Sequence, residues 1–153
     1  MTLPVTPPYA NLSDPSFRLA MMRRTVAVVL SEGSLWYPLL NLIATYLDGL
    51  ASGPKGGTKA AYIEYVSANL PGLSAAVGAQ SFYENFRNAT VHEFSLKPGF
   101  AIVRDSGMQG VYARKQQIAG VPGDTALLNI DLLAKEFLAH LDAVLAQHIS
   151  PSP

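Results

Sequence analysis

The sequence predicts a mainly α fold: an antiparallel bundle of about five helices with a small antiparallel β-sheet or hairpin inserted before the last helix. Two observations predict it. Apolar residues recur at helical spacing up to about residue 94 and again near the C-terminus. Between about residues 100 and 130, short strand-like segments alternate with Gly-containing turns. The 153 residues fit one domain, which we expect at 14–149 after a Pro-rich segment at 1–13.

The first two predicted helices cover about residues 15–31 and 35–51. Asp14-Pro15 is a typical helix start, because aspartate caps a helix and proline suits its first position. The second half of the first helix is apolar on all sides, which indicates a central place in the bundle. Glu32-Gly33-Ser34 ends this helix, and we expect Ser34 to cap the next one.

Two further helices are predicted at about 59–69 and 73–94, with a corner at Pro71-Gly72 between them. The loop before them, Ser52 to Thr58, has the residue types of a phosphate-binding loop. Their order is wrong, because such a loop needs lysine followed directly by serine or threonine. We therefore expect an ordinary connection between helices.

The chain after Lys97-Pro98-Gly99 changes to short strands. Strands are predicted at 100–104 and 111–115, joined by a turn at 105–107 and forming an antiparallel pair, with a third strand at 125–130. The last helix begins near Asn129 or Asp131 and runs to about His148, with apolar residues along one face.

The composition excludes several classes of protein. The chain is 49% hydrophobic and 14% charged, so it is not disordered. Its 11 basic and 11 acidic residues cancel, so no overall positive field attracts nucleic acid. Cysteine is absent, which excludes disulfides, zinc fingers and thiol catalysis. The low charge also predicts that part of the surface is covered in a homodimer.

The sequence predicts neither membrane insertion nor secretion. The longest strongly apolar stretch, Leu35 to Leu50, contains polar residues and is shorter than the ~20 residues that span a bilayer. The first residues lack the basic and apolar regions of a signal peptide. We therefore expect a cytoplasmic protein with no membrane partner.

The three histidines, His92, His140 and His148, do not form a metal-binding pattern. His140 and His148 are two turns apart on the last helix, too far for an i, i+4 pair of ligands. His140 flanks the apolar face, so we expect a hydrogen-bonded histidine at the edge of the core. No metal and no cofactor are expected.

The most informative segment is residues 82–94, FYENFRNATVHEF, near the end of a predicted helix. It contains Arg87, Asn88 and His92, and the last two share a helix face. These residue types suit metal-free RNA cleavage. Histidine can move the protons of the 2′-hydroxyl and the leaving oxygen, arginine can stabilise the phosphorane, and Asn88 can donate to a phosphate oxygen or orient the histidine.

Arg87-Asn88-x-x-x-His92 resembles the R-x4–6-H motif of the HEPN superfamily, including the polar residue that commonly follows the arginine. Members are compact helical bundles, usually homodimers. Many are metal-independent endoribonucleases of toxin–antitoxin, phage-defence or RNA-processing systems. The resemblance covers the motif helix closely and the helix order loosely, and the inserted strands are similar to those of a bacterial subfamily. It implies that Arg87 and His92 are the catalytic pair, that Asn88 supports them, and that RNA and an antitoxin or other protein are candidate partners.

Asp48 lies in the otherwise apolar second helix. A partly buried carboxylate needs a partner, and the candidates are Arg87 and an arginine near the N-terminus. We expect Asp48 to support the site or the dimer.

A structural role for the motif is the alternative. Arg87 could pair with Glu84 or Glu93, and His92 could stabilise the helix C-terminus. Both glutamates would repel phosphate, and the main basic cluster lies on the first helix at Arg18, Arg23 and Arg24. Two functions therefore remain open. One is a homodimeric, metal-independent endoribonuclease, and the other is a catalytically silent helical dimer that binds a protein or a ligand.

Overall fold

A computed structural model describes residues 14–53, 57–90 and 96–149, and the Pro-rich segment 1–13 lies outside these ranges. The elements, in chain order, are α1 (Pro15–Ser31), α2 (Trp36–Ser52), α3 (Lys59–Asn69), α4 (Pro71–Ala76), α5 (Ala79–Phe82), the π-helical turn η2 (Tyr83–Arg87), β1 (Phe100–Val103), α6 (Asp105–Met108), β2 (Ala113–Gln117), β3 (Asp124–Asn129) and α7 (Ile130–Ile149). The fold is mainly helical with a small sheet, as predicted. None of the helices in the described ranges is long and apolar enough to cross a bilayer.

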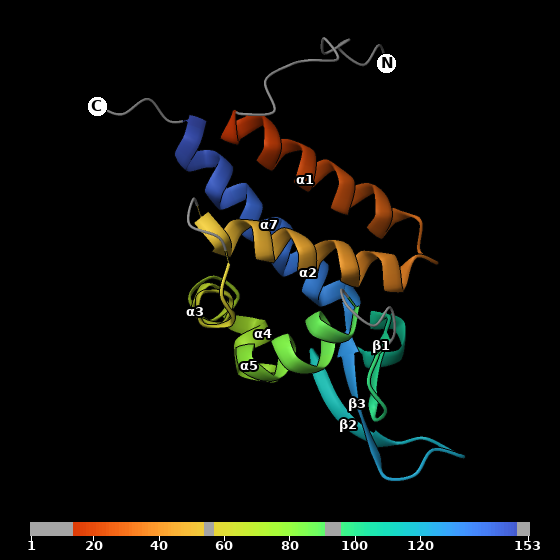
Figure 1. Cartoon of the computed structure of the whole chain (residues 1–153). Helices are drawn as coiled ribbons and strands as arrows, with labels where there is room; N and C mark the ends of the chain where they lie inside the picture. Colours follow the sequence, from red (N-terminus) through yellow and green to blue (C-terminus); the bar gives the residue numbers. More distant parts are fainter. Residues whose placement is uncertain (1–13, 54–56, 91–95, 150–153) are drawn as a thin grey trace.

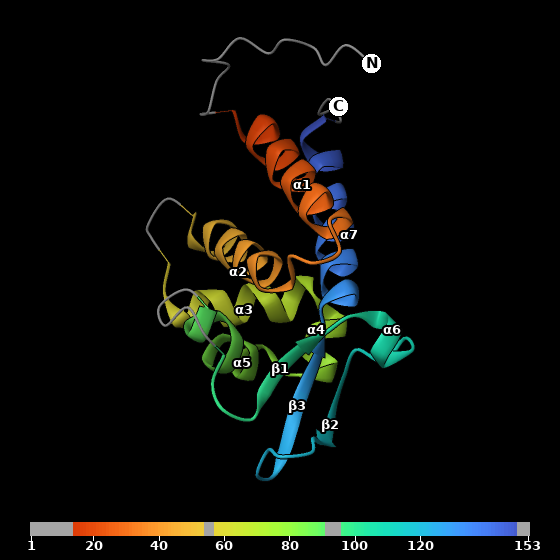
Figure 2. The same ribbon diagram turned by 90° about the vertical axis from the view of Figure 1, so that its right-hand side faces the viewer.

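The helices pack around one apolar core (Figure 1). α1 lies along α7, and α2 lies between this pair and α3. α4, α5 and η2 follow on the side of α2 and α3 that faces the sheet (Figure 2). The largest fully buried side chains come mostly from the helices, and include Leu40, Ile43, Tyr62, Phe82 and Phe137.

The helix starts show where local sequence signals decide the structure. The Asp14 carboxylate accepts the Ser16 backbone N–H at 3.0 Å, and Pro15 occupies the first position of α1, as predicted. Ser34 does not cap α2, because Leu35 holds the capping position without a side-chain bond. The turn before α2 is closed instead by the Trp36 indole N–H, which donates to the Gly33 carbonyl at 2.6 Å.

The predicted fourth helix at 73–94 is not continuous. α4 ends at Ala76, and Gly78 adopts a left-handed backbone with φ of 86°. Its N–H donates to the Leu73 carbonyl at 3.3 Å, which closes the end of α4, and its own carbonyl accepts from Phe82 to begin α5. Glycine takes this conformation without steric cost, so the chain turns here and continues as α5 and η2. Residues 91–94 of the predicted helix lie outside the described residues.

The sheet is mixed, and the prediction of a wholly antiparallel sheet is wrong. Its strand order is β1-β3-β2, with β3 parallel to β1 and antiparallel to β2. The predicted turn at 105–107 is instead the helical turn α6, followed by Gln109 and Gly110 with positive φ. The Asp105 carboxylate accepts from the Gly110 N–H and from the Asn129 amide. This segment carries the chain past β3, so β2 pairs on the far side of β3 from β1.

The sheet is attached to the helices by its central strand and by one of its faces. β3 continues directly into α7, where the Asn129 side chain accepts the Leu132 N–H at 3.2 Å. Phe100 of β1 packs edge-on against Phe86 of η2, with ring centroids 5.5 Å apart. The far end of the β2–β3 hairpin projects beyond the helices (Figure 2).

A carboxylate of α7 joins three parts of the fold. Glu136 accepts the backbone N–H groups of Gly72 at 2.6 Å and Leu73 at 3.0 Å, at the start of α4. It also accepts the Tyr112 hydroxyl at 2.6 Å, from the segment just before β2. The carboxylate caps α4 from a distant helix and holds the start of α4 against α7 and the segment before β2.

Candidate functional site

The structure brings Asp48 of α2 together with Arg87 at the end of η2. The Arg87 Nε donates to Asp48 Oδ2 at 3.1 Å, and its Nη2 forms an ion pair with the same oxygen. Its Nη1 donates to the Asn88 side-chain carbonyl at 2.8 Å. Of the two candidate partners predicted for Asp48, the structure shows Arg87, and three of the four predicted site residues lie in one cluster.

Two tyrosine rings enclose the arginine of this cluster. The Arg87 guanidinium carbon lies 5.0 Å from the Tyr83 ring centroid and 5.9 Å from that of Tyr62. The two rings meet edge-on at 5.1 Å. The Arg87 side chain is only 12% exposed and that of Asp48 is 30% exposed. The cluster is therefore compact and internally neutralised, with its cation shielded from solvent.

Tyr62 contributes a buried hydroxyl to the same surroundings. Tyr62 is 1% exposed, and its hydroxyl has no hydrogen-bond partner among the residues that the structure describes. Burial, followed by the nearby Asp48 carboxylate, raises the pKa of Tyr62. The hydroxyl therefore stays protonated and neutral, and it adds no charge to the cluster.

The segment that carries the motif is not a regular α-helix. Tyr83–Arg87 forms a π-helical turn, closed by the Asn88 N–H donating to the Tyr83 carbonyl. A π turn holds more residues than an α turn, so the helical spacing used to place Asn88 and His92 on one face does not apply through this segment. His92 and Glu93 both lie outside the described residues.

Glu84, which we considered as a partner of Arg87, forms an ion pair with another cation. The Lys59 ammonium donates to its carboxylate at 2.6 Å, and the Gln80 amide donates at 3.1 Å. These bonds lower the pKa of Glu84, the one from Lys59 most. The negative charge of Glu84 is therefore balanced by the Lys59 ammonium at the start of α3.

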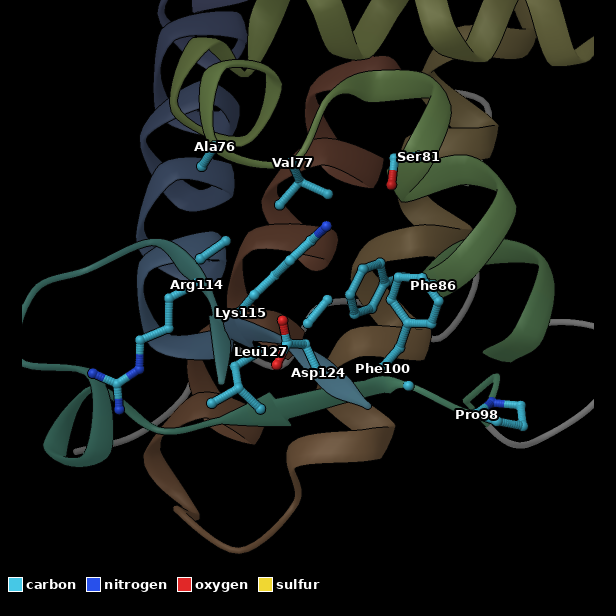
Figure 3. A pocket seen from close by; sticks show the side chains of 13 residues that line it. Ala76, Val77, Ser81, Phe86, Pro98, Phe100, Arg114, Lys115, Asp124 and Leu127 are labelled. Atoms are coloured by element: carbon cyan, nitrogen blue, oxygen red, sulfur yellow. The ribbon is translucent and has the colours of Figure 1, made fainter. Parts of the chain in front are cut away.

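A cavity of about 620 Å³ lies between the sheet and the α4–α5–η2 segment (Figure 3). Phe86 and Phe100 form apolar walls, and Val77 lies on the helical side. Lys115 of β2 reaches across toward Val77, and the Asp124 carboxylate of β3 lies in the same space. The cavity lining combines an apolar surface with two basic residues, Arg114 and Lys115, and one acidic residue, Asp124.

Sequence reasoning missed this cavity. Its walls depend on the β1-β3-β2 order, which places Phe100 and Lys115 on opposite sides of β3. The expected antiparallel pairing of the first two strands would have made them neighbours. No local pattern around Lys115 or Asp124 indicates that their side chains share a space with Phe86.

His140 has the structural role that we predicted. Its Nε2 is hydrogen-bonded to the Tyr65 hydroxyl at 2.7 Å, and burial lowers the pKa of His140. Within the described ranges, no three His, Cys, Asp or Glu side chains are placed to hold a metal ion.

Comparison of the chain with family models, curated proteins and solved structures finds no match in any of the three. Two local arrangements in the structure bear on function: the cluster of Asp48, Arg87 and Asn88, and the cavity between sheet and helices.

Proposed function

We propose that this chain is a catalytically silent binding module that takes its ligand in the cavity between the sheet and α4–α5–η2. The observation that carries this proposal is the state of Arg87. Its guanidinium is paired with Asp48, bonded to Asn88 and enclosed by two tyrosine rings. An RNA phosphate would have to displace Asp48 and leave that partly buried carboxylate without this cation, which costs up to about 3 kcal/mol.

The cavity has the properties of a ligand site. Its volume of about 620 Å³ falls within the few hundred to about 1,000 Å³ typical of small-ligand pockets. Phe86, Phe100 and Val77 supply apolar walls, and Lys115 and Asp124 can orient a polar group. These features suit a ligand, or a side chain of a protein ligand, that has an apolar body and a polar end.

The test uses anilinonaphthalene sulfonate, an apolar probe with an anionic end, in isothermal titration calorimetry. We expect one saturable site on the wild-type protein. Ala76→Trp, on the exposed side of the cavity wall, should abolish binding because the indole fills the cavity mouth. Ala75→Trp is the matched control, since Ala75 is equally exposed on α4 but does not line the cavity. Equal binding by the wild type and Ala76→Trp would contradict the proposal.

The second candidate function is a homodimeric, metal-independent endoribonuclease of the HEPN type. One observation favours it: Asp48, Arg87 and Asn88 are gathered at the end of η2, shortly before His92 in the chain. In this mechanism, incoming RNA displaces Asp48 from Arg87. Arg87 then stabilises the phosphorane, while His92 moves the proton of the attacking 2′-hydroxyl.

The experiment that separates the two functions is incubation with RNA in EDTA. The wild-type protein is compared with Arg87→Ala, His92→Ala and Asp48→Asn, with His148→Ala as the control for removal of a histidine. We expect intact RNA in every sample. Cleavage by the wild type and His148→Ala that is lost in Arg87→Ala and His92→Ala would establish the nuclease. The solution mass of the same samples checks the predicted homodimer.

A further inference from the structure

β2 is an outer strand of the sheet with an unoccupied edge. The strand order places it beside β3 alone, and within the described ranges no strand pairs with its other side. Such an edge offers backbone N–H and C=O groups to an additional strand. β2 itself is short and polar, with the sequence ARKQQ, and residues 114–117 are exposed.

The pairing with β3 shows which residues offer these groups. The Asn129 N–H donates to the Tyr112 carbonyl at 2.9 Å, so these two residues form a hydrogen-bonded pair. Bonded and non-bonded pairs alternate along an antiparallel ladder. Arg114 and Gln116 therefore also bond to β3, while Ala113, Lys115 and Gln117 direct their N–H and C=O groups outward. The free edge carries a regular set of donors and acceptors.

The side chains of this edge are basic. Arg114 and Lys115 are the only charged residues in 106–123, which contains no acid. Arg114 donates to the Gly107 carbonyl at 3.0 Å, an uncharged acceptor. Neither cation has a carboxylate partner among the described residues. The nearest acid on the sheet, Asp124, lies opposite Gln117 at the hairpin end of the pairing.

The positive charges of Arg114 and Lys115 indicate whether the β2 edge pairs with a second copy of the chain or with a different partner. Two β2 edges paired around a twofold axis would bring Arg114 and Lys115 of one copy against the same residues of the other. Like charges on neighbouring strands destabilise the pairing. An acidic strand would instead be attracted to this edge.

The cavity lies against one face of the sheet, next to the β2 edge. Lys115 is paired with Ala126, and Ala126 with Phe100, so all three residues point to the face that holds the cavity. Arg114, the next residue along β2, also lines the cavity, but strand alternation directs its side chain toward the opposite face. A strand added to the β2 edge would place alternate side chains at the cavity and beside Arg114.

We propose that the β2 edge binds an extended peptide segment of a partner protein, with apolar side chains toward the cavity and acidic side chains toward Arg114. This proposal rests on the cavity being the ligand site, and it adds the class of ligand. The peptide backbone bonds to Ala113, Lys115 and Gln117, and the stem of Lys115 packs on the apolar side chain that enters the cavity.

The experiment uses the ¹⁵N-labelled full chain and a short acetylated peptide of alternating valine and glutamate. Proton–nitrogen spectra measure the exchange of each amide with solvent, with and without the peptide. We expect the outward amides of Ala113, Lys115 and Gln117 to become protected on binding. The amides of Arg114 and Gln116 are already bonded to β3 and should change little. A matched peptide of alternating valine and lysine should not bind.

Two substitutions at one position separate backbone pairing from side-chain contact. Lys115→Pro removes an outward N–H, which an edge strand tolerates, and blocks the approach of a neighbouring strand. We expect binding about tenfold weaker or absent, from the loss of hydrogen bonds at this edge. Lys115→Ala keeps the N–H and should weaken binding less. Circular dichroism checks that both variants keep the fold.

Several outcomes would overturn the proposal. It fails if the glutamate peptide does not bind, if it binds without protecting the three outward amides, if Lys115→Pro binds as well as Lys115→Ala, or if the lysine peptide binds equally well. Failure here with normal binding of anilinonaphthalene sulfonate, sensitive to Ala76→Trp, rejects the peptide and keeps the cavity as a ligand site. Failure of both experiments rejects the proposed function as well.

Discussion

Arg87 of η2 and Asp48 of α2 form an ion pair that joins segments 39 residues apart in the sequence. The pair lies where α2, α3 and η2 meet, next to Tyr62 and Tyr83. It therefore holds the end of the motif segment against two helices. The same contact that supports the fold also occupies the group that an endoribonuclease would need.

Asp48→Asn tests how strongly this pair supports the fold. The substitution removes the carboxylate charge of Asp48 that faces the shielded Arg87 guanidinium, although the amide oxygen can still accept one hydrogen bond. We expect the free energy of unfolding in urea to fall by about 2 kcal/mol. Solution mass measured on the same variant tests the role of Asp48 in a dimer. Unchanged stability together with unchanged mass would show that Asp48 supports neither.

Removal of the Glu136 carboxylate should lower the free energy of unfolding more than Asp48→Asn does. Glu136→Ala leaves the N–H groups of Gly72 and Leu73 and the Tyr112 hydroxyl without their common acceptor, in a partly buried place. We expect a loss of about 3 kcal/mol in the free energy of unfolding. Glu64→Ala, at an exposed position of α3, is the control and should change stability by less than about 0.5 kcal/mol. Similar values for both variants would contradict the capping role.

Gly72 lies so close to this carboxylate that no side chain fits. A Cβ at Gly72 would lie 2.9 Å from Glu136 Oε1 and 3.1 Å from Tyr112 Cε2. Because three hydrogen bonds hold the carboxylate, Gly72→Ala should destabilise the protein by about 1 kcal/mol or more. Gly49→Ala is the matched control in α2, where a Cβ has no neighbour within 4 Å, and it should stabilise by up to about 1 kcal/mol.

The double variant Gly72→Ala/Glu136→Ala gives a second measurement of the contact between Gly72 and the Glu136 carboxylate. In a Glu136→Ala background the nearest clashing atoms are gone, so Gly72→Ala should cost less than it does alone. Additive changes in the free energy of unfolding would show that the two residues are not coupled.

The helix positions could be predicted where neighbouring residues determine them. α1 begins at Pro15 after the Asp14 cap and α3 covers Lys59–Asn69, in agreement with the predicted bounds. The break at Gly78 was missed because helical periodicity continues on both sides of it. The sheet order was missed because the short predicted turn at 105–107 favoured a hairpin, whereas the bonds of Asp105 to Gly110 and Asn129 are contacts that no local pattern shows.

The candidate site was predictable only in part, for the same reason. A lone acid in an apolar helix requires a cation, and this rule was enough to name Arg87 and an arginine near the N-terminus as the candidate partners of Asp48. The enclosure of Arg87 by Tyr62 and Tyr83 depends on how α3 packs against η2, so the sequence could not indicate that the guanidinium is shielded. This packing around Arg87 is what favours the proposed binding role over the proposed catalytic one.

His140 makes stability depend on pH. Burial lowers its pKa below the ordinary value of 6.5, so the folded protein favours the neutral ring, which is hydrogen-bonded to the Tyr65 hydroxyl. The unfolded chain takes up a proton near pH 6.5. The contribution of His140 to stability is therefore complete above pH 6.5 and is lost as the pH falls toward its lowered pKa.

Urea unfolding on either side of pH 6.5 should show a smaller decline in the free energy of unfolding at acid pH for His140→Gln than for the wild type. His148→Gln, at an exposed position of α7, should follow the wild type, and an equal decline in all three proteins would assign the effect to other groups.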